Sequence, residues 1–296
     1  MTEPLRLIAA GALEIGHYDL GPPDGPPVVL LHGFPYAATG CLPAARLLAG
    51  QGRRVLVPWL RGFGPTRFLG PGERSGQQAA LAEDLRAFLD ALAIPRAVLA
   101  GYDWGGRAAC ILAALHSDRV AGLVSGGSGC NILDHAAAAH PATPDQEHRH
   151  WYQHYFRTDR GRAGLTRHRA ELCRLLWRLW SPGWAFTEAE FAEAAESFEN
   201  PDFVEVTIHS YRHRFGGVPG DPGLDAIERA LAARPAIAVP TLVLHGAEDG
   251  VDPCTDHDRD APRFTGPHQR RVLPGVGHNV IQEAPEATAA AVLALA

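Results

Sequence analysis

One aspartate lies in a sequence context that could make its carboxylate a nucleophile. Residues 101–106 read GYDWGG and directly follow the apolar run Ala97–Ala100. Glycines two before and two after the central residue allow the close backbone approach of a tight strand-to-helix turn, which exposes the central side chain above the sheet. That central residue is Asp103. By itself, an aspartate here is equally well explained as the N-cap of the following helix.

One of the 15 histidines lies where a general base would be needed. His278 stands in the glycine-flanked sequence GVGHN, after the strand-like run Arg271–Leu273. An imidazole can activate water when a carboxylate holds its other ring nitrogen. We therefore expect His278 to act with Asp103, and we expect nearly all other histidines to be solvated or structural.

The acid that orients this histidine is expected at the end of the apolar run Thr241–His245, where the chain continues GAED. Asp249 is preferred over Glu248 because it lies one residue deeper into the loop, and Asp252 is a weaker alternative. The nucleophile, the acid and the histidine then follow one another in the chain, at positions 103, 249 and 278. This is the order found in hydrolases whose nucleophile lies in a tight turn between a strand and a helix.

Two backbone N–H groups could stabilise an oxyanion next to Asp103. Residues 32–35 read HGFP and follow the apolar run Val28–Leu31. The expected donors are the amide of Phe34 in this loop and the amide of Trp104, the residue after the nucleophile. The alternative, a plain Gly-Pro turn, is less common at this offset before such a strand-to-helix turn.

The elements that must position these residues alternate between buried strands and helices. Continuous apolar runs bounded by glycine and proline are typical of strands buried on both faces of a parallel sheet. Between two of these runs, Gln77–Leu92 has apolar residues at helical spacing. The pattern predicts an α/β fold with a mainly parallel sheet. The predicted strands are residues 28–31, 54–57, 97–100, 120–125, 241–245 and 271–273.

One long segment lacks the strand pattern. Residues 134–234 are helical, aromatic and rich in histidine and arginine, and they contain four of the six tryptophans. We interpret this segment as a helical cap inserted into one sheet domain. Residues 1–133 and 235–296 would then form the two parts of the core.

Composition limits the partners of the protein. The net charge of −6 is spread along the chain, so no basic surface indicates nucleic acid or an anionic membrane. No secretory signal is visible, and no apolar run approaches the roughly 20 residues of a transmembrane helix. The five scattered cysteines, without CxxC spacing, fit reduced thiols better than a disulfide framework or a zinc site. We expect a cytoplasmic monomer or homodimer that acts on a small molecule without metal or cofactor.

With these residues in place, the chain resembles the epoxide hydrolase and haloalkane dehalogenase branch of the α/β-hydrolase superfamily. The resemblance runs from residues 32–35 through LRGFG at residues 60–64 and the Asp103 turn to His278. It implies an α/β-hydrolase fold and a two-step mechanism. In that mechanism Asp103 forms an alkyl-enzyme ester, and His278, backed by Asp249, activates the water that hydrolyses the ester.

Within this branch, residues of the cap determine whether the leaving group is an epoxide oxygen or a halide. Residues 152–156 (YQHYF) and 210–212 (SYR) look like the two tyrosine motifs of epoxide hydrolases. The resemblance therefore implies that Tyr152 and Tyr211 donate protons to the epoxide oxygen. Tyr155 and Trp151 are further contributors to consider.

Dehalogenation with the same nucleophile is the main alternative. Haloalkane dehalogenases usually carry Asn where Phe34 stands, whereas both groups use Trp at position 104. Fluoroacetate dehalogenases place arginine at position 104, and Arg107 matches a second arginine of theirs. They take their triad acid from the loop after the strand that corresponds to residues 120–125, and this chain has no acid there. Epoxide hydrolysis to a vicinal diol is therefore favoured, and a non-catalytic ligand receptor is disfavoured by the complete triad. Trp59, where Asp is usual, and the tryptophan-rich cap predict a broad aromatic pocket, as in epoxide hydrolases that act on polyketides.

Overall fold

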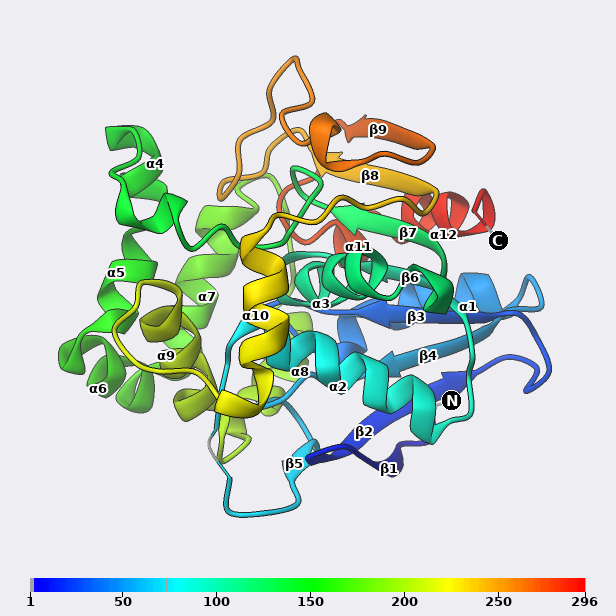
Figure 1. Cartoon of the computed structure of the whole chain (residues 1–296), viewed down its shortest axis with the longest axis horizontal. Helices are drawn as coiled ribbons and strands as arrows, with labels where there is room; N and C mark the ends of the chain where they lie inside the picture. Colours follow the sequence, from blue (N-terminus) through cyan, green and yellow to red (C-terminus); the bar gives the residue numbers. More distant parts are fainter. Residues whose placement is uncertain (1–2, 73, 296) are drawn as a thin grey trace.

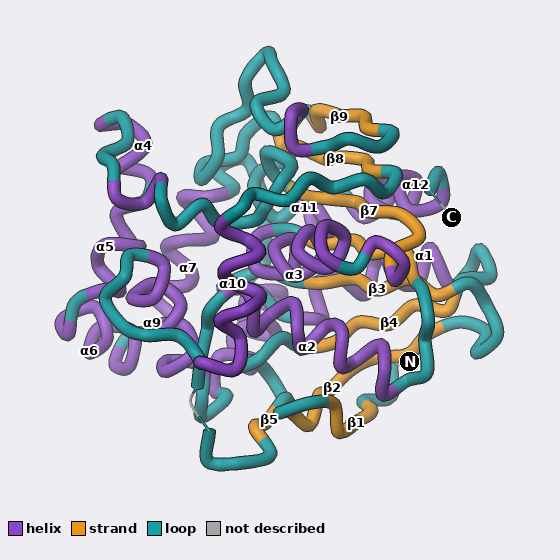
Figure 2. The backbone as a smooth tube through the Cα atoms, viewed as in Figure 1, coloured by secondary structure: helices purple, strands orange, loops and turns teal. Residues whose placement is uncertain are grey.

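A single twisted sheet forms the centre of the computed structural model, which describes residues 3–72 and 74–295 (Figures 1 and 2). Within these residues nine strands lie in the order β1-β2-β4-β3-β6-β7-β8-β9, with β5 beside β2. The strands from β4 through β9 along this path pair in parallel, whereas β2 is antiparallel to its neighbours. The strands are β1 (Arg6–Ala10), β2 (Leu13–Leu20), β3 (Pro27–Leu31), β4 (Arg54–Pro58), β5 (Arg67–Phe68), β6 (Ala97–Gly101), β7 (Val120–Gly126), β8 (Thr241–Gly246) and β9 (His268–Leu273). The predicted α/β fold with a mainly parallel sheet is confirmed.

Five of the six predicted strands, namely β3, β4, β6, β7 and β8, are largely buried on both faces. Every residue of β6 and β8 is buried, and β3 and β4 are buried except at their first residue. The antiparallel strands β1 and β2 were not predicted, because exposed and polar residues interrupt their apolar pattern. For the same reason β9, at the edge of the sheet, begins three residues before the predicted strand: its first four residues read HQRR.

Helices cover both faces of the sheet. On one face α2 (Gln78–Ala91) packs against α3 (Asp103–Leu115), and on the other α1 (Leu42–Ala49) packs against α12 (Pro285–Leu293) (Figure 1). The short helix α11 (Val280–Glu283) precedes α12. This sandwich leaves the carboxyl ends of the parallel strands as the edge where loops from β3, β6 and β8 meet.

A run of helices enters the chain between β7 and β8 and lies beyond that edge of the sheet (Figure 1). The first α-helix starts at Pro144, later than the predicted start near residue 134, because residues 127–143 form loops with positive φ at Gly127 and Gly129, interrupted by a 3-10 turn at Ala137–Ala139. The run comprises α4 (Pro144–Arg149), α5 (Trp151–Arg157), α6 (Asp159–Arg167), α7 (Arg169–Trp180), α8 (Glu188–Glu196), α9 (Phe203–Arg214) and α10 (Asp225–Ala232).

Aromatic packing and one buried hydrogen bond attach these helices to the loop after β3. The indole Nε1 of Trp177 donates to the carbonyl oxygen of Pro35 at 2.7 Å. The ring of Phe34 stacks on Phe203, with centroids 6.0 Å apart, and contacts Trp180 at 6.3 Å. The helical run therefore lies directly above the loop that was predicted to supply an oxyanion donor.

Three expectations from composition concern absent features. Within the described residues, no helix combines the length and apolar character needed to cross a membrane. All five cysteines are free thiols. In the same part of the chain, no group of three or more histidine, cysteine or acidic side chains is arranged to hold a metal ion.

A buried ion pair ties the loop after β4 to α2. The Nε and Nη2 atoms of Arg61 donate to the two carboxylate oxygens of Asp84 at 2.6 and 2.7 Å, and Nη1 donates to the carbonyl oxygen of Ser75 at 2.6 Å. The two side chains are only 7% and 12% exposed. Such bidentate geometry satisfies both charges, but removing one partner leaves the other buried and unpaired.

Asp84→Ala should therefore lower the free energy of unfolding by about 3–5 kcal/mol. Asp90→Ala, on the same helix but with a side chain that is 45% exposed, is the matched control and should cost less than about 1 kcal/mol. Denaturant unfolding followed by circular dichroism measures both changes. Equal midpoints for the two variants would contradict the importance of the buried pair.

Candidate active site

Asp103 occupies the turn between β6 and α3 in a left-handed backbone conformation, with φ of +50°. A Cβ atom at Gly101 would lie 2.6 Å from the carbonyl carbon of Gly105, and one at Gly105 would lie 2.5 Å from the carbonyl oxygen of Leu31. Both glycines are therefore required by close backbone approach. Asp103 is the first residue of α3, whose N-cap is Tyr102, and its Oδ1 accepts the N–H of Phe34 from another loop. The N-cap alternative is thus wrong.

His278 lies between two carboxylates. Its Nδ1 atom is 2.9 Å from Oδ2 of Asp249, and its Nε2 atom is 4.0 Å from Oδ2 of Asp103. The second oxygen of Asp249 accepts the N–H groups of Val251 and Asp252 at 2.8 and 3.0 Å. The structure thus brings together the three residues that the sequence predicted as a triad.

The two alternative acids do not face the histidine. The side chain of Asp252 pairs with Arg259. The carboxylate of Glu248 lies against Gly183, where an added Cβ would be 2.0 Å from Oε2. Of the three candidate acids, Asp249 is therefore the one whose carboxylate contacts His278.

Two residues that sequence reasoning did not identify hold the loop of His278. Glu283 accepts the N–H groups of Gly277 and Asn279 at 2.7 and 2.9 Å, and it accepts the hydroxyl of Ser181 at 2.6 Å. The oxygen of Ser181 in turn accepts the N–H of His278 at 3.0 Å. Ser181 follows α7 and is 97 residues from His278 in sequence, so no local motif could indicate this contact.

The loop after β3 presents its backbone to Asp103. The N–H of Phe34 donates to Oδ1 of Asp103 at 2.8 Å. His32 fixes this loop: its Nδ1 atom is 2.9 Å from the carbonyl oxygen of Gly33, and its Nε2 accepts the N–H of Leu60 at 3.1 Å. Burial lowers the pKa of His32 to about 4, so it stays neutral and structural. Trp104 is in the first turn of α3, where backbone N–H groups have no partner within the helix.

Tyr152 on α5 and Tyr211 on α9 are buried side by side, with ring centroids 5.7 Å apart and planes at 89°. Tyr211 also contacts the rings of Phe34 and Trp104, at 5.8 and 6.4 Å. Gln153 donates to the hydroxyl oxygen of Tyr152 at 3.3 Å, which leaves the phenolic proton of Tyr152 free to donate. Burial raises the pKa of both phenols, so both are protonated at neutral pH.

The other two aromatic residues that were considered lie elsewhere. The hydroxyl of Tyr155 packs against α6, where a Cβ added at Gly164 would be 2.0 Å away. Trp151 contacts Tyr152 and Tyr155 with its ring but lines a separate cavity of about 400 Å³. The structure does not bring either residue to Asp103.

The charges of His278 and Asp103 stabilise each other. Burial by itself would lower the pKa of His278, but the negative charges of Asp249 and Asp103 outweigh it and raise the pKa to about 10. Burial likewise acts to raise the pKa of Asp103, but His278, Arg107 and the N–H of Phe34 lower it overall. At neutral pH the site therefore holds a carboxylate next to an imidazolium.

A cavity of about 510 Å³ opens onto Asp103, His278 and Tyr152. Its lining also includes Arg107, Gln153, Arg214 and several backbone segments of the loop after β7. The lining does not match the predicted broad aromatic pocket, because it contains Tyr152 but none of the tryptophans of the described residues. Trp59 packs on Tyr18 at 4.7 Å, and Trp177 stacks on Trp184 at 5.1 Å.

The chain belongs to the alpha/beta hydrolase fold family, whose model matches residues 26–285. Epoxide hydrolase A of Mycobacterium tuberculosis is 27% identical over 97% of this chain and 95% of its own length. The crystal structure of a candidate epoxide hydrolase from Klebsiella pneumoniae is 44% identical, covers 98% of this chain and 96% of its own, and superimposes with a TM-score of 0.96. A haloalkane dehalogenase of Mycobacterium marinum is 37% identical over 38% of this chain and 37% of its own length. These relatives confirm the predicted branch and identify the chain as a hydrolase of that branch.

Asp103→Asn should lower the pKa of His278 from about 10 toward its ordinary value near 6.5, because one of the two negative charges beside the imidazole is removed. The measurement is an NMR titration of the imidazole signals. Asp252→Asn is the control, since that carboxylate pairs with Arg259 and not with His278. An unchanged pKa in Asp103→Asn would show that the 4.0 Å contact carries no electrostatic coupling.

Proposed function

We propose that this protein is an epoxide hydrolase that converts an organic epoxide to a vicinal diol through an ester on Asp103. The observation that carries the proposal is the pairing of Tyr211 with Tyr152, which lines the cavity where Asp103 faces His278. Ring opening turns the epoxide oxygen into an alkoxide, which needs a proton donor. The carboxylate nucleophile needs only an unobstructed approach to an epoxide carbon. The near full-length relative named as an epoxide hydrolase supports the same activity.

In the first step an oxygen of Asp103 attacks an epoxide carbon and the carbon–oxygen bond of the ring breaks. The alkoxide takes the phenolic proton of Tyr152 or Tyr211. Esterification removes the negative charge of Asp103, and with it one of the two charges that hold the proton on His278. The pKa of His278 falls, and its proton can return to the phenolate through water in the cavity. Formation of the ester thus converts His278 from an acid into a base.

In the second step neutral His278, oriented by Asp249, removes a proton from water, whose oxygen attacks the ester carbonyl carbon. The N–H groups of Phe34 and Trp104 stabilise the resulting oxyanion. Collapse transfers the hydroxyl proton of the intermediate to the departing alkoxide, which releases the diol. The carboxylate of Asp103 and the imidazolium of His278 are restored, so all protons balance.

Residues 134–234 act as the cap in this proposal. They contribute Tyr152, Tyr211 and the Ser181 contact to the loop of His278. The cap therefore supplies the proton donors and also helps to position the base.

Hydrolytic dehalogenation is the second candidate, and one observation favours it. The indole Nε1 of Trp104 is buried and has no hydrogen-bond partner within the described residues, so it could bind a halide. Phe34 offers no side-chain N–H as a second donor, and the haloalkane dehalogenase relative matches only 38% of the chain. The epoxide reaction is therefore the better supported of the two.

His278→Gln should trap the ester, because glutamine cannot act as the base of the second step. After incubation with styrene oxide, intact-protein mass spectrometry should find an adduct of the full substrate mass, and peptide mapping should place it on Asp103. The double variant His278→Gln/Asp103→Asn is the control and should carry none. A haloalkane adduct lacking hydrogen halide, without any epoxide adduct, would instead establish dehalogenation. No adduct with styrene oxide, 2,3-epoxybutanoate or a haloalkane would contradict both functions.

Tyr152→Phe and Tyr211→Phe should each slow ester formation by roughly 10²-fold, as expected for loss of general-acid catalysis. Rapid-quench measurement of the alkylation step gives this rate. Tyr155→Phe is the matched control, because its hydroxyl packs against α6. If Tyr152→Phe and Tyr211→Phe both keep the full rate, these tyrosines are not the proton donors.

A further inference from the structure

Two arginines in the cavity of Asp103 lack an acidic partner. Within the described chain Arg107 forms no ion pair, and its one hydrogen bond runs from Nε to the carbonyl oxygen of Asn131 at 3.3 Å, although its side chain is only 6% exposed. Arg214 donates from Nη1 to the amide oxygen of Gln153 at 2.8 Å, and its buried Nε has no partner. Both line the same cavity.

The acids around this cavity are engaged with other groups. Asp252 pairs with Arg259, and Asp134 with Arg234. Asp260 accepts the hydroxyl of Ser128 at 3.1 Å and the N–H of Cys130 at 3.0 Å. Asp103 faces His278. Arg107 and Arg214 therefore lack a salt-bridge partner among the described residues, although the charge of Asp103 acts on Arg107.

The two guanidinium groups lie close enough to influence each other. Burial, followed by the positive charge of Arg214, lowers the pKa of Arg107 to about 10. A buried guanidinium such as that of Arg107 is costly beside a second, partly buried one unless an anion joins them. Arginine is also the side chain best suited to a planar oxyanion, which it can bind through two parallel N–H donors.

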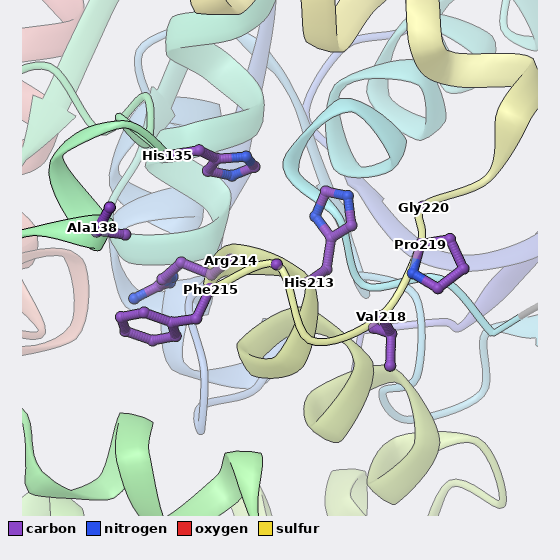
Figure 3. Close-up of a pocket in the computed structure, with 10 residues that line it drawn as sticks. His135, Ala138, His213, Arg214, Phe215, Val218, Pro219 and Gly220 are labelled. Atoms are coloured by element: carbon purple, nitrogen blue, oxygen red, sulfur yellow. The ribbon is translucent and has the colours of Figure 1, made fainter.

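Arg214 also faces outward. It lines a second cavity, of about 360 Å³, together with His135, His213 and Phe215 (Figure 3). The same side chain thus contributes to the lining of both cavities. Arg214 therefore brings a positive charge to both cavities, where it can attract an anion from the outer cavity toward the inner one.

We propose that Arg107 and Arg214 bind a carboxylate carried by the epoxide substrate, so that the enzyme acts on epoxy acids. This inference rests on the proposed function. Arg107 lies four residues after Asp103 on α3, and Arg214 three residues after Tyr211 on α9, so each is on the same helix face as a reacting group. One helical turn spans about 5.4 Å, which places the anion within a few bonds of the epoxide ring.

A single negative charge fits this site better than a double one. The attacking group, Asp103, is itself an anion, so each further charge on the substrate increases repulsion at the nucleophile. Two arginines offset one carboxylate, but a phosphonate or phosphate dianion would meet stronger repulsion. The site thus selects a monoanionic carboxylate.

The test compares 2,3-epoxybutanoate with its amide, which has nearly the same shape but no charge. The wild-type enzyme should prefer the carboxylate in kcat/KM by tenfold or more, mainly through KM, because ion-pair contacts are made before the ring opens. Arg214→Gln and Arg107→Gln should each reduce this preference by about tenfold or more. Arg214→Lys, which keeps the charge, should restore part of it.

Arg212→Gln is the matched control on the same helix. The Arg212 side chain donates to Asp159 and to the carbonyl oxygen of Arg157, outside the cavity, so the preference should not change. Equal use of acid and amide by the wild-type enzyme, or better use of the corresponding epoxy phosphonate, would overturn the carboxylate proposal while leaving epoxide hydrolysis intact. A preference that survives in both glutamine variants would show that the two arginines are not its source. Failure to hydrolyse any epoxide, with no ester trapped in His278→Gln, would contradict the proposed function itself.

Discussion

The imidazolium of His278 between the carboxylates of Asp249 and Asp103 is the interaction on which the rest of the site depends. Three charged groups are buried together, and each would be costly alone. Their mutual attraction keeps Asp103 ionised as a nucleophile and keeps His278 protonated in the resting state. In the proposed mechanism, loss of one carboxylate charge on esterification is the event that frees the base. The proposed chemistry therefore depends directly on the electrostatic interactions among these three residues.

Backbone geometry holds these charges in place. The parallel strands β3, β6 and β8 end at one edge of the sheet and deliver the loops of Phe34, Asp103 and Asp249 to the same place. The left-handed conformation of Asp103 is maintained by glycines whose neighbours leave no room for a side chain. The N–H of Phe34 then contacts the carboxylate directly. The helical run adds the Ser181 contact, so the position of His278 depends on residues from both parts of the fold.

The residues that line the cavity above Asp103 are mainly polar or charged, with four aspartates and three arginines among them, so the cavity is not the aromatic pocket that the tryptophan content suggested. The tryptophans contribute mostly to packing between helices and on the sheet. Arg107 and Arg214 instead line this cavity without a salt-bridge partner among the described residues. The proposed preference for an epoxy acid follows from these two arginines, which have no salt-bridge partner among the described residues. The tyrosine pair defines the reaction, and the arginine pair defines which molecules undergo it.

The sequence by itself determined the features that depend on local backbone geometry or continuous burial. The turn at Asp103, the loop of residues 32–35 and the fully buried strands each have a short-range pattern, and the structure places them as predicted. The choice of Asp249 over its neighbours also followed from its place in the loop. Only the tertiary structure decided the contacts between distant segments. Ser181 contacts His278, and Arg214 lines the same cavity as Arg107, because helices far apart in the chain pack over one edge of the sheet. No local pattern encodes such pairings, since they depend on where whole helices lie. The partly exposed strands β1 and β2 escaped prediction for a related reason: solvent on one side allows polar residues that interrupt the apolar pattern.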